Sequence, residues 1–496
     1  MNSSDDGSLR IAWASRDVST DKPVGIRGQF HLRISEGVMD PVTVTALAIS
    51  NDEDSVIFLS CDIVVMWSFM VKTIRAKVHK TNPAIPVEKI IMNATHTHEG
   101  GDVYEAEDPF ETLPRMPGKE YQAFFSDRAA DAIVEAWNKR QPGGVSWGYG
   151  FAFVGQSRRA VYFDDVSKRP DAAARPGLMV NGHAVMYGKT NDPMFSHLEA
   201  GADHFLNVLF TYDPDNNLTG ALVNVPCPSQ VDGSIWKLSA DYWHEARAEL
   251  RKKFGKDFFV LPQCAPSGDL SPNYMYYKEA MKRRMELKGV NHRQDIAEQI
   301  AKGVEEVSGW ASKDIRRSLP LAHVTRTIQL TRRPITKEEY ENELATLKTL
   351  EQGKESSDPE LKQRMIADSR LASAKKRCQN VIDRYENYQK NPKLPTELHV
   401  VRLGDIAFAS NRFELYMDYA HRIQARSPAV QTFVIQLAGS EVGERGGSYL
   451  PTERGEWGKG YSATQYCNLV NSTGGQELVE ETLGDINKLF SAQENK

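Results

Sequence analysis

Over its first 275 residues the chain alternates short apolar runs with amphipathic helical stretches, and this pattern restricts the fold more than any other feature. The apolar runs, which are typical of buried strands, lie at 56–59, 89–92, 206–212, 222–225 and 258–261. Apolar residues recur at helical spacing in 67–78, 121–137 and 241–254. Strands that alternate with helices predict an α/β protein with a layered, mixed-sheet core.

The range 276–395 differs from the rest because it is rich in Lys, Glu, Arg and Gln. Its spacing predicts one strand at 321–330 and two long charged helices at 337–350 and 360–388. We interpret this range as a charged helical insertion. A coiled coil that binds a partner is the alternative, but no sustained heptad supports it.

The alternation of strands and helices returns in 396–496. The catalytic core is therefore expected in two parts, 1–275 and 396–496, around the insertion. No internal repeat is recognisable. The strands and helices expected in the second part lie at 400–403, 406–409, 413–423, 432–437 and 477–490.

Composition excludes several classes of protein. The 496 residues are 40% hydrophobic with a formal net charge of -5, and no basic run offers a nucleic-acid surface. No apolar run approaches the ~18 residues that a transmembrane helix needs. The five cysteines are scattered without a CxxC pair, so they predict no cysteine-built zinc knuckle, although one disulfide stays possible. The first eight residues carry no signal peptide; we expect a secreted or periplasmic protein whose export signal has been removed.

Polar residues that could carry chemistry follow the predicted strands. His96 and His98 come after the strand at 89–92, and in an extended segment both rings would face one site. Ser271 lies in a Gly-Asp-Leu-Ser-Pro-Asn loop after the strand at 258–261. Cys227 stands between two prolines after another strand, and Glu414 begins an expected helix, where the helix dipole would stabilise its charge.

Each of these segments also has a purely structural interpretation: a turn, a cap or a buried small side chain. Taken in order, however, the Thr-His-Thr-His segment, the Asn-x-x-Cys-Pro strand end, the Gly-Asp-x-Ser-Pro-Asn loop, a late Glu and a late Tyr resemble the neutral/alkaline ceramidase family of zinc amidases. The resemblance spans roughly 24–275 and 398–490 and stops where the family's C-terminal immunoglobulin-like domain would begin.

The resemblance implies a zinc site and an active-site set. His96, Glu414 and Tyr449 match the family's zinc ligands, with Tyr461 as the alternative tyrosine. His98 matches the second histidine beside the metal, where it would move a proton or donate to an oxyanion. Ser271 and Arg158 match residues that orient the scissile group, although Ser157 replaces the asparagine that precedes this arginine in the family.

Cys227 departs from the family, which has a zinc-binding histidine at that position. A thiolate is a good zinc ligand, so we expect Cys227 to complete the site; His98, His183 or His204 are alternatives. The leading hypothesis is a zinc-dependent amidase that cleaves an N-acyl, ceramide-like lipid. A hydrolase of a glycosidic or ester bond in a glycan and a non-catalytic binding protein are the other hypotheses.

Overall fold

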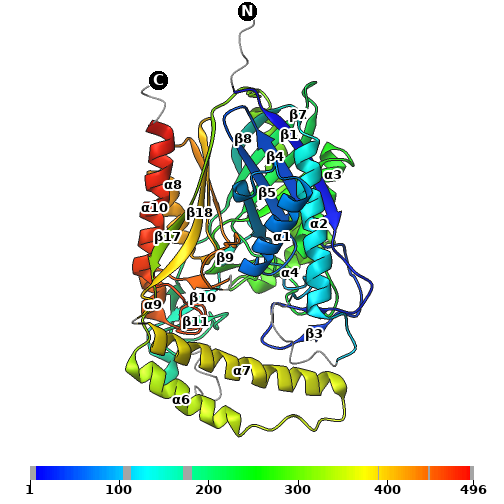
Figure 1. The fold of residues 1–496 in the computed structure, drawn as a ribbon. Helices are drawn as coiled ribbons and strands as arrows, with labels where there is room; N and C mark the ends of the chain where they lie inside the picture. The colour runs from blue at the N-terminus through cyan, green and yellow to red at the C-terminus, as the bar shows by residue number, and fades with distance from the viewer. Residues whose placement is uncertain (1–6, 104–112, 171–180, 389, 445–446, 492–496) are drawn as a thin grey trace, which may run out of the picture.

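A computed structural model describes residues 7–103, 113–170, 181–388, 390–444 and 447–491. It confirms the α/β class: three mixed sheets of four or five strands meet at a central apolar core, and each has helices on its outer face (Figure 1). No helix within these residues is long and apolar enough to cross a membrane. The five cysteines are free.

The three sheets repeat one topology. In each, a first strand pairs antiparallel with a second, the second pairs antiparallel with a third, and a crossover helix leads to a fourth strand parallel to the third. A second helix then packs across the first two strands. We call these three parts units 1, 2 and 3. This repeat is not visible in the sequence, because it lies in strand order and not in residue identity.

Unit 1 comprises β1 (Arg10–Asp17), β4 (Thr43–Ser50), β5 (Ser55–Cys61), α1 (Ser68–Thr81), β6 (Ile90–Ala94) and α2 (Gly118–Asn138). Unit 2 comprises β8 (Gly144–Phe151), β13 (Phe205–Tyr212), β14 (Leu218–Val225), α3 (Tyr242–Phe254), β15 (Phe259–Cys264) and α5 (His292–Ala311). Unit 3 comprises β17 (Leu321–Thr331), β18 (Lys393–Leu403), β19 (Ile406–Ser410), α8 (Met417–Arg426), β21 (Gln431–Ile435) and α10 (Ser472–Ser491).

Each unit carries an insertion between its first and second strands. Unit 1 inserts β2 (Gly25–Ile26) and β3 (Arg33–Ile34), and unit 3 inserts the helical hairpin of α6 (Lys337–Glu351) and α7 (Leu361–Asn387). Unit 2 inserts four short strands: β9 (Gln156–Ser157), β10 (Arg159–Tyr162), β11 (Ala184–Met186) and β12 (Phe195–Leu198). All three insertions leave the same end of the sheets, opposite the chain termini, as the lower part of Figure 1 shows. This end also carries the loops that follow the parallel strands.

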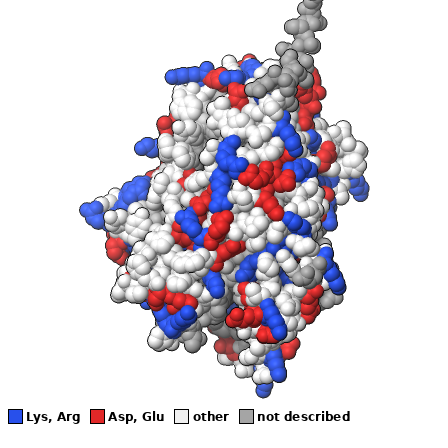
Figure 2. Space-filling view, turned by 90° about the vertical axis from the view of Figure 1, so that its left-hand side faces the viewer, with Lys and Arg blue, Asp and Glu red and all other residues white. Residues whose placement is uncertain are grey.

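The charged range 276–395 is divided in the structure. The helix α5 buries Ile296, Ile300 and Val304 against unit 2, and β17 pairs with β18 along its whole length, so both belong to the core. The hairpin of α6 and α7 is the part that projects (Figure 1). On the α10 side of the molecule, Lys and Arg are interspersed with Asp and Glu (Figure 2). Pairs such as Arg426–Glu480 and Arg326–Glu481 lie at the surface of α10.

Candidate active site

Three of the predicted site segments follow the carboxyl ends of strands that have a parallel neighbour. His96 follows β6 of unit 1, Gly268 to Ser271 follow β15 of unit 2, and Glu414 follows β19 of unit 3. Open α/β sheets bind their ligands at such ends, where neighbouring loops diverge. The three units therefore each supply one wall of a common site.

His96 is held in one orientation. Its Nδ1 atom lies 2.6 Å from the carbonyl oxygen of Val64, which can only accept, so Nδ1 donates this hydrogen bond. Nε2 lies 3.3 Å from Oε2 of Glu414. The backbone of His96 is left-handed with a φ of 65°, which corrects the expectation of an extended segment. The rings of His96 and His98 still meet, with centroids 5.1 Å apart.

Glu414 lies in the short strand β20 (Glu414–Leu415) and not in a helix, because α8 begins only at Met417. The helix-dipole explanation therefore does not apply. β20 pairs in parallel with β22 (Tyr449–Leu450) and sets Glu414 opposite Tyr449. Burial works to raise the pKa of Glu414, but His96, Arg158 and the Tyr449 hydroxyl hold it below its usual value.

Tyr449 and Arg158 complete this cluster. The guanidinium of Arg158 donates to the Tyr449 hydroxyl oxygen at 3.2 Å and to the carbonyl oxygen of Gly268 at 2.8 Å. Burial and the neighbouring Glu414 carboxylate raise the pKa of Tyr449, so its hydroxyl keeps its proton without a bound cation. The ring of Tyr461 packs edge-on against Tyr449 at 5.6 Å, which places the alternative tyrosine beside the same cluster.

The Gly-Asp-Leu-Ser loop is docked on the Glu414 segment. A Cβ atom on Gly268 would lie 2.3 Å from the carbonyl oxygen of Glu414, so only glycine permits this approach. The amide of Gly268 donates to Leu415, and the carboxylate of Asp269 accepts from the amide of Met417 at the start of α8. This loop motif therefore fixes the position of a glutamate far away in the sequence.

Ser271 lies beside this cluster with a tyrosine that the sequence did not single out. The Tyr187 hydroxyl donates to Oγ of Ser271 at 3.0 Å, and the amide of Asn273 donates to the same oxygen at 3.1 Å. Tyr187 has a φ of 56°, a strained conformation that no sequence pattern announces.

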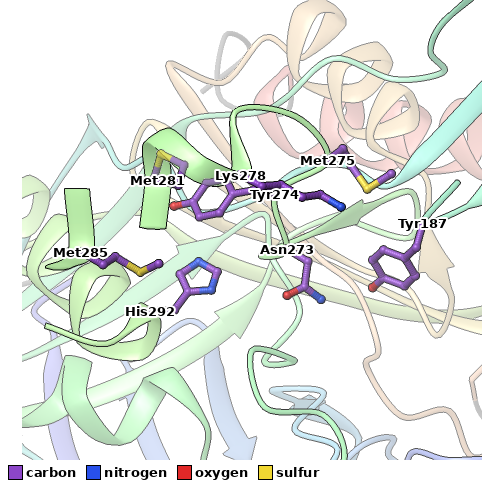
Figure 3. Close-up of a pocket in the computed structure, with 8 residues that line it drawn as sticks. All are labelled: Tyr187, Asn273, Tyr274, Met275, Lys278, Met281, Met285 and His292. Atoms are coloured by element: carbon purple, nitrogen blue, oxygen red, sulfur yellow. The ribbon is translucent and has the colours of Figure 1, made fainter. Parts of the chain in front are cut away.

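A pocket of about 380 Å³ opens next to Tyr187 and Asn273 (Figure 3). The helix α4 (Lys278–Lys288) forms one side of it with Met281 and Met285. Unbranched thioether side chains adapt to flexible apolar groups, so this pocket suits an alkyl chain better than a rigid ring. Its remaining lining residues are Tyr274, Met275, Lys278 and His292.

His98 is positioned by the insertion of unit 1. Its ring lies against Gly28, where a Cβ would come within 2.5 Å, and its carbonyl oxygen accepts from the buried Arg33. Burial, with the neighbouring His96, Arg33 and Arg158, lowers the pKa of His98 well below its usual value. A neutral imidazole at this position can accept a proton.

The structure does not bring the Cys227 thiol into a three-residue cluster with His96 and Glu414. Among the described residues, no group of three or more His, Cys, Asp or Glu side chains could hold a metal ion. Sγ of Cys227 lies 3.4 Å from the carbonyl oxygen of Pro228, within the apolar cluster of unit 2. Burial raises the pKa of this thiol, so it is neutral there.

The alternative histidines have other neighbours. The ring of His183 stacks on Trp457 at 4.8 Å, and that of His204 packs against Phe153 at 4.7 Å. Sequence reasoning also missed Gln436, whose buried amide accepts from the amides of Ser267 and Leu415 and so joins units 2 and 3. Gln436 lies within the strand predicted at 432–437, which ends at Ile435 in the structure, so a polar side chain in an apolar run was the only available signal.

Comparison with known proteins supports the fold. No protein-family model matches this chain, and no curated protein matches its sequence. The neutral ceramidase from Pseudomonas aeruginosa superposes with a TM-score of 0.66 and 16% identity, covering 97% of this chain and 75% of that one. A ceramidase complexed with C2 superposes with a TM-score of 0.64 and 15% identity, covering 97% and 76%. The chain therefore shares the ceramidase fold.

Proposed function

We propose that this protein is a hydrolase that cleaves the amide bond of an N-acyl compound, with a zinc ion held by His96, Glu414 and Tyr449. The observation that carries the proposal is the convergence of these three side chains from units 1 and 3. Ceramidases that share the fold make an amide the first substrate class to test.

The donor set fits zinc in three respects. His96 turns Nε2 towards Glu414, and its other nitrogen is held by a backbone carbonyl, as in many metal-binding histidines. Glu414 is ionised, and Tyr449 stands opposite it. The Cys227 thiol is not required in this proposal. When bound, zinc supplies Lewis acidity to the amide carbonyl and to a water molecule.

The other side chains act on the substrate. The guanidinium of Arg158, fixed by Gly268 and Tyr449, donates to oxygen as charge develops on the scissile carbonyl. Ser271, held by Tyr187, orients the same group. His98 is neutral and would accept a proton from the attacking water and pass it to the nitrogen of the leaving amine.

The proposal is tested with the purified protein, its metal content and a substrate panel. Zinc per chain is measured by plasma mass spectrometry, and N-dodecanoyl amides, the matching esters and chromogenic glycosides are offered under one condition. Zinc-dependent turnover of the amides supports the proposal. Turnover of the glycosides or esters alone would show that the protein cleaves a different bond. A protein that holds no zinc and turns over no substrate would support the hypothesis of a binding protein on this fold.

A further inference from the structure

The insertions of units 1 and 3 meet over the candidate site. The loop between β2 and β3 packs against the ring of His98 at Gly28, and its Phe30 ring meets Tyr461 edge-on at 5.6 Å. The helix α7 crosses this loop, and Oγ of Ser369 accepts from the amide of Leu32 at 3.0 Å. The rings of Phe30 and Tyr461 therefore lie between α7 and Tyr449.

Three arginines lie at seven-residue intervals along α7: Arg370 is exposed, and Arg377 and Arg384 are half-buried. Arg384 donates to the carbonyl oxygens of Gln465 and Asn468, so its role is structural. Arg377 lies in the middle, with its guanidinium 4.9 Å from the centre of the Phe30 ring.

Arg377 has no carboxylate within ion-pair distance among the described residues, although other arginines around it are paired or bonded to carbonyls. Its one hydrogen bond there joins it to Oγ of Ser373 at 2.9 Å. A half-buried guanidinium offers five donors, so this arrangement leaves most of them for another group. Arg370 adds a second positive charge near His31, whose pKa is lowered by burial and by Arg370 and Arg33.

We propose that Arg377 binds an anionic group on the amine part of the substrate, so that the preferred substrate is an N-acyl amide that carries a carboxylate, as in an N-acyl amino acid. This inference rests on the proposed function for its reaction. A guanidinium matches a carboxylate with two parallel hydrogen bonds. The methionine-lined pocket beside Ser271 takes the alkyl chain, and the charged amine part lies towards α7.

The test compares two probes with the same acyl chain, N-dodecanoylglycine and N-dodecanoylethanolamine. Arg377→Gln is expected to lower the ratio of their kcat/KM values about tenfold, the usual effect of losing a charged hydrogen bond, and Arg377→Lys should lower it less. Lys376→Gln is the matched control, because it removes one charge from the exposed face of the same helix. Thermal melting checks that each variant is folded.

Binding is measured separately with N-dodecylsulfonylglycine and N-dodecylsulfonylethanolamine, which contain no amide bond. If Arg377→Gln hydrolyses both amides with an unchanged ratio of kcat/KM values, the anion site is wrong and the proposed hydrolase activity stands. A different result is that the wild-type protein binds the sulfonylglycine more tightly than the sulfonylethanolamine, loses this preference in Arg377→Gln, and hydrolyses no amide. That result keeps the anion site and overturns the proposed hydrolase activity. Equal binding of the two sulfonyl probes overturns the anion site.

Discussion

Nε2 of His96 lies 3.3 Å from Oε2 of Glu414, although one residue follows β6 of unit 1 and the other follows β19 of unit 3. Gly268 of unit 2 packs against the backbone of Glu414 from the other side. The cluster therefore exists only when all three units are assembled, and none of them could hold it alone.

Glu414→Gln is expected to remove most of the bound zinc, because a neutral amide is a much weaker ligand than a carboxylate. Zinc per chain, measured after dialysis, should fall from about one to below one half. Glu480→Gln is the control, since that carboxylate lies on the surface with Arg426. Equal zinc content in the two variants would argue against the metal site.

Cys227→Ser is expected to keep its zinc and to lose about 1 kcal/mol of stability, because the thiol packs in an apolar cluster. Urea unfolding and metal analysis of the same preparation separate the two effects. Loss of zinc in Cys227→Ser, together with its recovery in Cys227→His, would show instead that the thiol is a ligand.

Gly268→Ala is expected to lower activity at least tenfold and to destabilise the fold, because the new methyl group would meet the carbonyl oxygen of Glu414. Gly309→Ala is the control: it lies in α5 with nothing near its Cβ, and there alanine should add up to about 1 kcal/mol of stability. Near-wild-type activity in Gly268→Ala would mean that the loop can move away without consequence.

The free energy of unfolding is expected to fall between pH 6.5 and 5. His323 and His399 are buried and bonded at 3.0 Å, and His399 contacts Glu397, which is paired with Arg75. Burial lowers the pKa of both histidines below 6.5, so the unfolded chain binds more protons than the folded one in this window. For each extra proton that the unfolded chain binds, the free energy of unfolding falls by about 1.4 kcal/mol for each pH unit of acidification.

Urea unfolding at pH 7.5 and 5.5 measures this loss of stability. Glu397 contributes only at lower pH, because its pKa of about 2 lies below the 4.5 of an unperturbed glutamate. His399→Gln should weaken the pH dependence, whereas His197→Gln, at an exposed position, should leave it unchanged. An identical pH dependence in His399→Gln and wild type would exclude this histidine pair as the cause.

The hairpin of α6 and α7 is expected to be dispensable for folding and zinc binding. Thr331 of β17 pairs with Lys393 of β18, so a short glycine-rich turn can join the strands after removal of 334–391. The shortened protein should keep its zinc and lose its preference for N-dodecanoylglycine, because Arg377 is gone. A folded but zinc-free product would show that the hairpin supports the metal site directly.

Local pattern predicted most of the elements. The helices expected at 121–137, 241–254 and 337–350 are present as α2, α3 and α6, because apolar spacing and helix caps act over short distances. The order of motifs also led to His96, Glu414 and Tyr449 before their geometry was known.

Long-range relations could not be predicted in the same way. The two-residue strand β20 is too short to leave a periodic signal, and it forms only because β22 lies beside it. The left-handed backbone of His96 depends on contacts with Val64, which is distant in sequence. The surroundings of Cys227 follow from how unit 2 packs, and the flanking prolines carry no information about that.

The pairing of Glu414 with Tyr449 also limits how this chain can change. Both residues are delivered by one two-residue ladder, so a one-residue shift in its register would bring Ser448 or Leu450 opposite Glu414. Such a slip would exchange a phenol for a side chain with different chemistry and leave the sheets intact. We therefore expect natural variants to differ in length in the hairpin between β17 and β18 while the pairing of Glu414 with Tyr449 is kept, and a survey of such variants can look for that contrast.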